Sequence, residues 1–377
     1  MSHNDDKVLV VLGTRPEAIK LAGIIRELGP NGAVVHTGQH YDENMWDRVL
    51  GDLAGVKVTD HIGIGGRSRG EQIGLATQEL TRYLLQHPCR AVVVQGDTNS
   101  TLAGGLAASA TGTPLVHVEA GLRSHDRAMP EEVNRILVDQ IADLCCTPLS
   151  ANSFQLRREG VEDERILVTG NTLLDAMGAL LPSEQERAAL LSELDLVDGQ
   201  YVLSTVHRAG TVDDEQRLTR LVEALAALAE QTTVVIPMHP HTAKNIETWG
   251  LGDKLGKVRT IEPLPPKSFI GLEAGAALLV SDSGGVQEEA CLFRRPLLVV
   301  RDSTERPELL ETDESGFPWC RLLGDLDPVT EMTRAWADAL VWREALAERA
   351  LPYPEHSASA AIVAEIERRW PHHHHAH

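Results

Sequence analysis

The first segment whose residue types suit chemistry is GTRPE, residues 13–17, with Lys20 one turn further along the chain. It directly follows a short apolar run; Gly13 permits a tight turn, and Pro16 suits the first turn of a helix. Free N–H groups at a helix start favour an anion, and the Arg15 guanidinium can donate two hydrogen bonds to a phosphate. The segment predicts an anion site; the alternative is a capped helix start with a surface arginine.

Three carboxylates follow predicted strands in the first half of the chain. Asp97 lies in QGDTNST at the mouth of one strand, and Glu119 ends the next apolar run, where a carboxylate is costly unless it is paired or functional. Glu131 opens a helix, where negative charge is stabilised in any case. Each can be read singly as a cap or turn residue. Together they predict carboxylates converging for acid–base chemistry.

The segment SDSGGVQEE, residues 281–289, is the best single candidate for binding phosphate. Ser283, Gly284 and Gly285 lie between a predicted strand and a predicted helix, where exposed backbone N–H groups bind an anion. Glu289 comes about one and a half turns later and can accept hydrogen bonds from two ribose hydroxyls. A glycine-rich strand–helix turn is weak evidence on its own.

The second half also offers an imidazole and two arginines near strand ends. His207 follows the strand at 201–205 and can contact phosphate or shuttle a proton, although an ordinary loop histidine is the simpler reading. Arg301 and Arg306, in RDSTERPE, add positive charge against an acidic background. The alternative for both is a solvated surface arginine.

Several familiar motifs are missing from the chain. It has no Walker loop, no GxGxxG fingerprint and no GxSxG elbow. Histidines and cysteines show no metal-ligand spacing outside the tail PHHHHAH, so neither a metal nor a cofactor is expected. The five cysteines include no CxxC pair, and we expect buried, reduced thiols, with Cys145 and Cys146 on opposite faces of one strand.

Short apolar segments alternate with helical ones in both halves of the chain. The expected strands cover residues 8–12, 34–37, 91–95, 115–119, 144–147, 166–168, 201–205, 233–237, 276–281 and 296–301. The expected helices cover residues 19–28, a segment beginning near Glu43, and residues 101–110, 130–142, 214–230 and 286–292; the fourth carries Val133, Ile136, Leu137 and Ile141 on one face.

This alternation predicts an α/β protein with two doubly wound domains, each with a parallel sheet covered on both faces. The first domain is expected to cover residues 1–170 and the second to begin at 171, with 181–200 connecting the halves. Ligands of such sheets bind beyond the carboxyl ends of the strands. We therefore expect the site in a cleft that the two domains face.

Composition excludes several classes of function. The net charge is −20, which disfavours nucleic acid and anionic membranes as partners. No apolar run reaches the roughly 18 residues of a membrane span, and the amino terminus lacks the pattern of a secretory signal. A soluble, cytoplasmic protein is expected. Residues 371–377 form a histidine-rich tail that resembles an expression tag and are left out of the fold prediction.

Taken together, these segments resemble one enzyme family. The matching stretches are VLGTRPEAIKL, TGQHYDENM, QGDTNSTLAG, HVEAGLRS, MPEEVNRILVDQ, VTGNTLLDA, STVHR, SDSGGVQEEA and RDSTERPE. They occur in the family's order from residue 10 to about 318, and several are long and specific. In these stretches the chain resembles the non-hydrolysing UDP-N-acetylglucosamine 2-epimerases.

The resemblance implies a glycosyltransferase-B-like fold of two Rossmann-like domains, the second covering residues 171–354, with a helix at about 355–370 packing back on the first. It also implies a homodimer and a UDP-sugar substrate. The implied reaction is reversible epimerisation of UDP-N-acetylglucosamine to UDP-N-acetylmannosamine. The C2 proton is removed, UDP leaves by anti elimination, and UDP re-adds to a 2-acetamidoglucal intermediate.

The resemblance also implies roles for individual residues. Asp97, Glu119 and Glu131 match the essential carboxylates, and His207 matches the essential imidazole. The residues matched to substrate binding are Arg15 and Lys20 near the diphosphate and sugar, Phe269 beside the uracil, Ser283, Gly284 and Gly285 in the phosphate turn, Glu289 on the ribose, and Arg306 as a further essential arginine.

Two departures from the family pattern concern regulation and substrate choice. Where regulated members carry basic and amide residues, Tyr41-Asp42-Glu43-Asn44 stands here, so we expect no activation by the substrate; Ala209-Gly210-Thr211 replaces acidic and amide residues after Arg208. The alternatives are a 2-epimerase of a modified UDP-sugar such as a UDP-diacetamido uronic acid, a hydrolysing epimerase, a glycosyltransferase of the same fold, and a non-catalytic nucleotide-sugar sensor.

Overall fold

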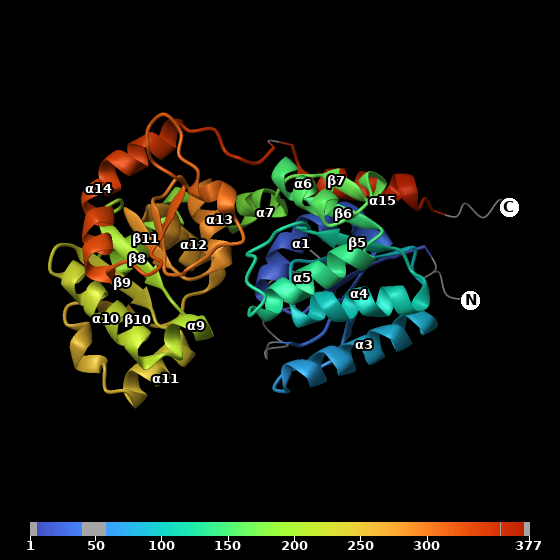
Figure 1. Cartoon of the computed structure of the whole chain (residues 1–377), viewed down its shortest axis with the longest axis horizontal. Helices are drawn as coiled ribbons and strands as arrows, with labels where there is room; N and C mark the ends of the chain where they lie inside the picture. The colour runs from blue at the N-terminus through green and yellow to red at the C-terminus, as the bar shows by residue number, and fades with distance from the viewer. Residues whose placement is uncertain (1–5, 40–57, 355, 373–377) are drawn as a thin grey trace. The chain divides into compact units, whose positions relative to one another are not determined.

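The computed structural model describes residues 6–39, 58–354 and 356–372. The chain divides into two units, one formed by Met1–Ala179 with Pro352–His377 and the other by Leu180–Leu351 (Figure 1). The helix expected near Glu43 and the segment Tyr41–Asn44 lie outside the described residues.

The first unit is built on a seven-stranded parallel sheet of order β3-β2-β1-β4-β5-β6-β7. Its strands are β1 (Val8–Leu12), β2 (Gly32–His36), β3 (Asp60–His61), β4 (Ala91–Gln95), β5 (Leu115–Val118), β6 (Leu144–Thr147) and β7 (Ile166–Val168). Its helices are α1 (Arg15–Leu28), α3 (Arg69–Gln86), α4 (Asn99–Thr111), α5 (Pro130–Ile141), α6 (Ser150–Arg158), α7 (Thr172–Leu180) and α15 (Ala358–Arg369). The order reverses between β1 and β4, as in a Rossmann fold.

Both faces of this sheet are covered, which explains why its strands are apolar throughout. Leu9 and Val11 point into a core shared with α3, α4 and α5. Val8, Val10 and Leu12 point to the opposite core, which α1 and α15 close. Cys145 and Cys146 also divide between the two cores, as predicted, and all five cysteines are free thiols.

Helix α15 belongs to the first unit although it lies at the far end of the chain (red in Figure 1). Ile362 and Ile366 are fully buried in the α1 core. Arg90 adds two hydrogen bonds to the Glu367 carboxylate, at 2.6 and 2.9 Å. The apolar face and this ion pair hold the helix to the first sheet.

The second unit repeats the same design with six parallel strands of order β10-β9-β8-β11-β12-β13. They are β8 (Tyr201–Thr205), β9 (Thr233–Pro237), β10 (Arg259–Ile261), β11 (Leu278–Ser281), β12 (Leu297–Val299) and β13 (Cys320–Leu322). The helices are α8 (Glu184–Glu193), α9 (Ala209–Val212), α10 (Glu215–Ala229), α11 (Pro240–Thr248), α12 (Pro266–Gly275), α13 (Gly284–Leu292) and α14 (Pro328–Glu348). The predicted α/β class with two Rossmann-like units is confirmed.

The predicted strand 115–119 is one residue too long. Strand β5 ends at Val118 because Glu119 has φ 66°, a left-handed conformation that a strand cannot contain. The predicted strands at 276–281 and 296–301 also shorten, to β11 and β12. No helix among the described residues is long and apolar enough to cross a membrane.

The apolar face expected on α5 is not the face that the helix buries most. Its buried residues are Glu132, Asn134, Arg135, Val138 and Asp139, whereas Leu137 is 46% exposed. Polar side chains occupy the inner face because they bind the ends of the neighbouring strands, as the next section describes.

Candidate active site

In the first unit, a buried glutamate joins the loops that follow β1 and β4. Glu17 accepts hydrogen bonds from the Gly13 N–H at 3.0 Å and from the hydroxyls of Thr14 at 2.7 Å, Thr98 at 2.7 Å and Thr101 at 3.1 Å. Burial raises the pKa of Glu17, and these four donors oppose the rise. The loop bearing Arg15 is thus tied to the loop bearing Asp97, a role that sequence reasoning did not assign to Glu17.

Helix α1 also supplies a cation to the end of β5. Lys20 Nζ lies 2.5 Å from Glu119 Oε2, and Gln95 Nε2 donates to the same oxygen at 2.6 Å. The side chains of Lys20 and Glu119 are only 7% and 11% exposed. The left-handed backbone at Glu119 costs on the order of 1–3 kcal/mol and recurs at functional sites. The contact brings two of the predicted site residues together.

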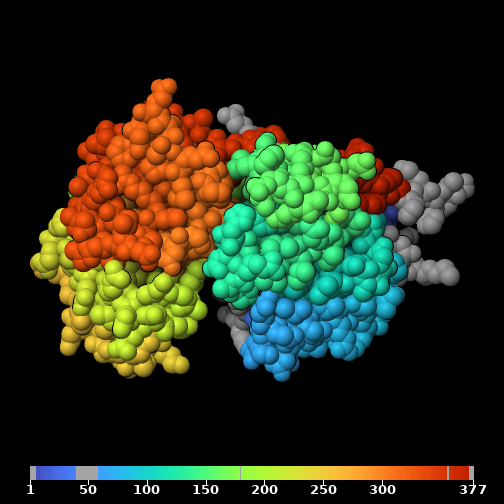
Figure 2. Space-filling view, viewed as in Figure 1, coloured from blue at the N-terminus to red at the C-terminus, as the bar shows by residue number. Residues whose placement is uncertain are grey.

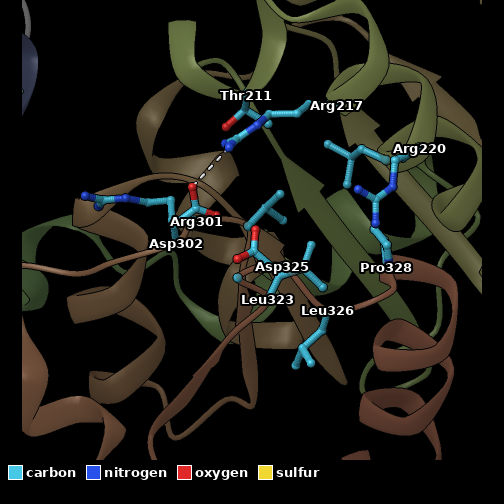
Figure 3. Close-up of a pocket in the computed structure, with 12 residues that line it drawn as sticks. Thr211, Arg217, Arg220, Arg301, Asp302, Leu323, Asp325, Leu326 and Pro328 are labelled. Atoms are coloured by element: carbon cyan, nitrogen blue, oxygen red, sulfur yellow. Dashed lines mark hydrogen bonds and ion pairs between the residues drawn. The ribbon is translucent and has the colours of Figure 1, made fainter. Parts of the chain in front are cut away.

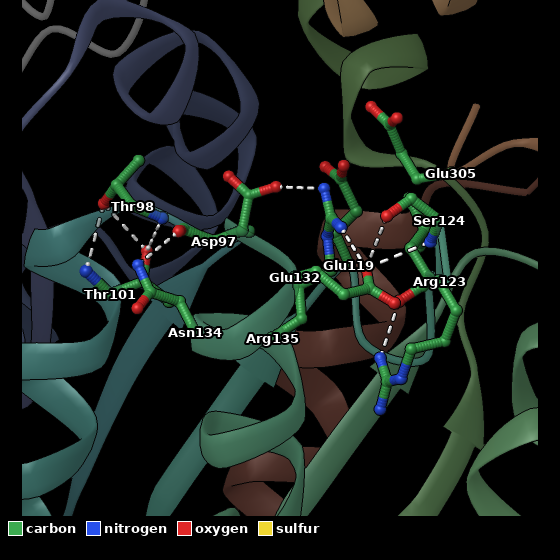
Figure 4. Close-up of polar contacts among 12 residues, drawn as sticks. Asp97, Thr98, Thr101, Glu119, Arg123, Ser124, Glu132, Asn134, Arg135 and Glu305 are labelled. Atoms are coloured by element: carbon green, nitrogen blue, oxygen red, sulfur yellow. Dashed lines mark hydrogen bonds and ion pairs between the residues drawn. The ribbon is translucent and has the colours of Figure 1, made fainter. Parts of the chain in front are cut away.

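The inner face of α5 binds the loops that follow β4 and β5 (Figure 4). Arg135 forms an ion pair with the Asp97 carboxylate and donates to Glu132 Oε2 at 2.7 Å. Asn134 Nδ2 donates to the Asp97 carbonyl at 2.8 Å. Glu132 in turn accepts the N–H groups of Ser124 and His125, both at 3.0 Å. Asp97 is therefore oriented by α5 while its side chain stays 28% exposed.

The neighbouring glutamates Glu131 and Glu132 have different environments. Glu132 is 1% exposed and belongs to the network on the inner face of α5, whereas Glu131 is half-buried in the first turn of the same helix. Sequence reasoning singled out Glu131 and missed Glu132. The available signal was that Glu132 and Arg135 are three residues apart, a spacing that allows an ion pair on one helix face.

In the second unit, a buried aspartate shapes the turn that carries His207. Asp282 follows β11, is fully buried, and accepts the N–H groups of His207 at 3.1 Å and Arg208 at 2.9 Å. Burial lowers the pKa of His207, and the Asp282 carboxylate opposes this. The neutral imidazole is therefore favoured, and it can accept as well as donate a hydrogen bond.

The glycine turn at the start of α13 packs against Arg306. Arg306 Nη1 lies 2.6 Å from Glu305 Oε1, and its Nη2 lies 3.2 Å from Glu288 Oε2. All three side chains are at most 5% exposed. Arg301 contacts the second oxygen of Glu305 at 2.9 Å. The two buried glutamates fix the arginine beside the turn, and neither was identified from the sequence.

The remaining two candidates also lie in the second unit. Phe269 is half-buried in α12, and Glu289 is half-buried in α13. The two helices contact one another. The structure thus groups Ser283, Gly284, Gly285 and Arg306 tightly, with Glu289 on the same helix and Phe269 on its neighbour.

A pocket in the second unit lies apart from these candidates (Figure 3). It lies between the loops after β12 and β13 and the starts of α10 and α14, and of the residues singled out from the sequence it is lined by Arg301 and Thr211. Arg217 and Arg220 line it together with Asp302 and Asp325, and Arg217 pairs with Asp302 at 3.1 Å. With Arg301, three arginines face two aspartates, and the lining carries more positive than negative charge. In the part of the chain that the structure describes, no group of three or more His, Cys, Asp or Glu residues is placed to hold a metal ion.

Comparison with known proteins gives concordant matches over most of the chain. The family model described as UDP-N-acetylglucosamine 2-epimerase matches residues 29–367. The UDP-N-acetylglucosamine 2-epimerase of Methanocaldococcus jannaschii is 41% identical over 81% of this chain and 86% of its own. The UDP-2,3-diacetamido-2,3-dideoxy-D-glucuronate 2-epimerase of Pseudomonas aeruginosa is 39% identical over the same shares. The crystal structure of the M. jannaschii enzyme with UDP-GlcNAc and UDP superposes with a TM-score of 0.83 at 37% identity, covering 96% of this chain and 99% of that one.

Proposed function

Because the chain belongs to the UDP-N-acetylglucosamine 2-epimerase family, we propose that it interconverts UDP-N-acetylglucosamine and UDP-N-acetylmannosamine by inverting C2 of the sugar. The observation that carries the proposal is that the two sheets present different kinds of functional group. The first sheet presents carboxylates held by buried cations, and the second presents a glycine turn beside a buried arginine. The first arrangement suits proton transfer and the second suits a diphosphate.

The second unit binds the UDP in this proposal. The N–H groups at Ser283, Gly284 and Gly285 and the guanidinium of Arg306 contact the phosphates, and His207 approaches them from the end of β8. Glu289 accepts the ribose hydroxyls, and Phe269 lies against the uracil. The buried partners of Arg306 support this assignment, since a guanidinium fixed before the substrate arrives needs no reorganisation when charge develops.

The first unit carries out the proton transfer. A carboxylate among Asp97, Glu119 and Glu131 removes the proton from C2, and the C–H electron pair becomes the C1–C2 double bond as the bond from C1 to the UDP oxygen breaks. The products are bound UDP and 2-acetamidoglucal. Re-addition reverses these steps, with a proton delivered to the opposite face of C2. Lys20 forms an ion pair with Glu119 and Arg135 forms one with Asp97, so both carboxylates are held in place by cations of the first unit.

Stabilisation of the leaving diphosphate is the largest demand of this reaction. The C2 proton is weakly acidic, so elimination proceeds only if the negative charge gained by UDP is met as it develops. Arg306 and the start of α13 meet it in the second unit, and Arg15, at the start of α1, is the matching cation of the first. These residues supply the charge that the departing group needs.

We also propose that the enzyme works as a homodimer that buries the outer face of α5. That face carries Leu137, which is 46% exposed, and the adjacent helix α4 carries Leu106, which is 37% exposed. Figure 2 shows this part of the chain, in teal, at the surface of the first unit. An apolar helix face left in water is typical of an interface between subunits.

A modified UDP-sugar is the second candidate substrate. It is favoured by the 39% identity to the diacetamido-glucuronate epimerase, which nearly equals the 41% to the M. jannaschii enzyme. Ala209-Gly210-Thr211 in α9 begins two residues after His207, where a change of side chains can alter sugar preference. The distinguishing feature of that substrate is a uronic acid carboxylate.

Incubation of the protein with UDP-N-acetylglucosamine alone, followed by proton NMR, tests the proposal. Signals of UDP-N-acetylmannosamine should grow to a stable ratio without free sugar. Release of UDP with free N-acetylmannosamine would instead identify a hydrolysing enzyme. No change with this substrate, together with turnover of the diacetamido uronic acid analogue, would establish the second candidate.

A further inference from the structure

A histidine in the middle of β5 faces an acceptor on each side of its ring. His117 is fully buried, with Nδ1 2.7 Å from Asp139 Oδ1 and Nε2 2.8 Å from the carbonyl oxygen of Gly96. A carbonyl oxygen only accepts, and so does an ionised carboxylate. Both ring nitrogens can satisfy these partners at once only if both carry a proton. The geometry therefore requires the imidazolium when Asp139 is ionised.

The surrounding charges support the ionised form of Asp139. Its Oδ2 lies 2.7 Å from Arg123 Nη2 and accepts the Gly121 N–H at 3.2 Å. Burial acts to raise the pKa of Asp139, but the charges and hydrogen bonds of His117 and Arg123 outweigh it, so the pKa lies below its ordinary value. Arg123 also pairs with Glu159 at 2.6 Å. The chain from His117 to Glu159 thus alternates in sign and has no net charge, as a buried ionic network requires.

His117 and Asp139 each bind a loop that carries a proposed catalytic carboxylate. Gly96, whose carbonyl accepts the His117 proton, immediately precedes Asp97. Gly121, whose N–H binds Asp139, lies two residues after Glu119. Gly121 has φ 81°, and a Cβ there would lie 2.5 Å from the Asn152 carbonyl oxygen, so the second loop has little room to shift.

We propose that His117 and Asp139 are positioning residues, in which a buried imidazolium–carboxylate pair fixes the loops of Asp97 and Glu119 relative to one another. The pair contacts the loop backbones and takes no part in proton transfer. The assignment rests on the proposed function because Asp97 and Glu119 are the groups it positions. It adds a requirement for activity that Asp97 and Glu119 alone do not reveal: the buried, ionised pair of His117 and Asp139 must be present.

The ionisation of His117 can be measured without reference to activity. The protein, labelled with ¹⁵N-histidine, should show at pH 7.5 one ring with protons on both nitrogens, and His117→Gln should remove that signal. A His117 ring protonated only at Nε2 would place the proton on Asp139 and overturn the proposal. This result stands whether or not the protein epimerises UDP-N-acetylglucosamine.

The positioning role is tested by kinetics of His117→Gln and Asp139→Asn with substrate protonated or deuterated at C2. Displacement of reacting groups by about 1 Å lowers turnover by about 100-fold. We expect a loss of that order in kcat, KM within about threefold, unchanged UDP affinity and a larger deuterium isotope effect. Partial unfolding lowers the rate but leaves the isotope effect unchanged. His87→Gln, before the amino end of β4, is the matched control and should retain wild-type kinetics.

Four outcomes separate the possibilities. Wild-type kcat in both variants would overturn the positioning role, and so would a lowered kcat with an unchanged isotope effect. Failure of His117→Gln to fold would be detected by circular dichroism. In that case the kinetics of Asp139→Asn still test the positioning role, and the ring-nitrogen spectrum of the wild type still tests the ionisation of His117. Absence of epimerase activity in the wild type would refute the proposed function, and the spectrum would then decide the charge assignment alone.

Discussion

Gly284 leaves the space that the Glu305 carboxylate occupies: a Cβ added at residue 284 would lie 2.5 Å from Glu305 Oε1 and 3.1 Å from Arg306 Nη1. The start of α13 and the loop after β12 therefore pack as one surface. A side chain at this position displaces either the turn or the ion pair that holds Arg306. The backbone φ of Gly284 is not positive, so its backbone conformation does not itself require glycine. The close approach of Glu305 is what requires it.

Gly284→Ala should weaken UDP binding. Loss of one or two hydrogen bonds to a charged group, about 1.5–3 kcal/mol, corresponds to a dissociation constant about 10- to 100-fold higher. Titration calorimetry with UDP measures the change. Gly285→Ala is the matched comparison, because its Cβ would meet only Ser283 Oγ, at 3.8 Å, and its effect should be smaller. Equal losses in the two variants would contradict the packing argument.

Asp97→Asn, Glu119→Gln and Glu131→Gln preserve shape but remove basicity. A general acid or base contributes roughly 100- to 10,000-fold in rate, so kcat should fall by at least 100-fold in each variant. UDP should still bind, since the proposed phosphate site lies in the second unit. Glu162→Gln, a surface carboxylate that is 66% exposed, serves as the control. Near-normal turnover in all three variants would mean that these carboxylates are structural.

Turnover in deuterium oxide should place deuterium at C2 of both epimers. The reason is that the C2 proton is transferred to a protein group and exchanges with solvent before it is returned. Proton NMR of the recovered UDP-sugars measures the label. Retention of the original proton through many turnovers would instead indicate oxidation and reduction at another carbon.

Glu308 should make the protein less stable as the pH rises towards neutrality. Burial raises the pKa of Glu308 to about 7, with Arg306 opposing, while an unfolded chain has the ordinary value of 4.5. Between these values the folded state binds more protons than the unfolded state, so the free energy of unfolding falls across that window. The loss is on the order of 3 kcal/mol above pH 7.

Glu308→Gln should remove this pH dependence. Urea unfolding at pH 5 and pH 8 should give a smaller difference in the variant than in the wild type, with the variant the more stable at pH 8. Glu344→Gln, at an exposed position of α14, should behave as the wild type does. An unchanged difference between the two pH values in Glu308→Gln would show that this group is not responsible.

Leu137→Asp should dissociate the proposed dimer. Burying a leucine contributes about 1.5–3 kcal/mol, so the dimer dissociation constant should rise by at least about 10-fold. Sedimentation velocity over a range of protein concentrations measures it. Leu340→Asp, at a 59% exposed leucine of the second unit, should leave the dimer intact. A dimer that survives Leu137→Asp would place the interface elsewhere.

The candidate site could be proposed from the sequence where its residues lie in contiguous segments. The turn at Ser283–Gly285 and the loop at Gly13–Glu17 each combine a strand end, a glycine and a helix start within a few residues. The roles assigned to Asp97, Glu119, Glu131 and His207 remain predictions. The carboxylates that support Asp97, His207 and Arg306 were not found from the sequence; they are Glu132, Asp282, Glu288 and Glu305. A carboxylate near a helix start reads equally well as a solvated or dipole-stabilising group.

The sequence by itself determined the two parallel-sheet units and the family, because apolar strands, glycine turns and helix starts are local patterns that survive without knowledge of packing. Only the tertiary structure decided which charges meet. Lys20 and Glu119 are 99 residues apart, Asp97 and Arg135 are 38 apart, and His207 and Asp282 are 75 apart. It also turned the polar face of α5 inward, against the apolar pattern. Ion pairing with other strand ends stabilises that face, and those partners exist only once the sheet has formed.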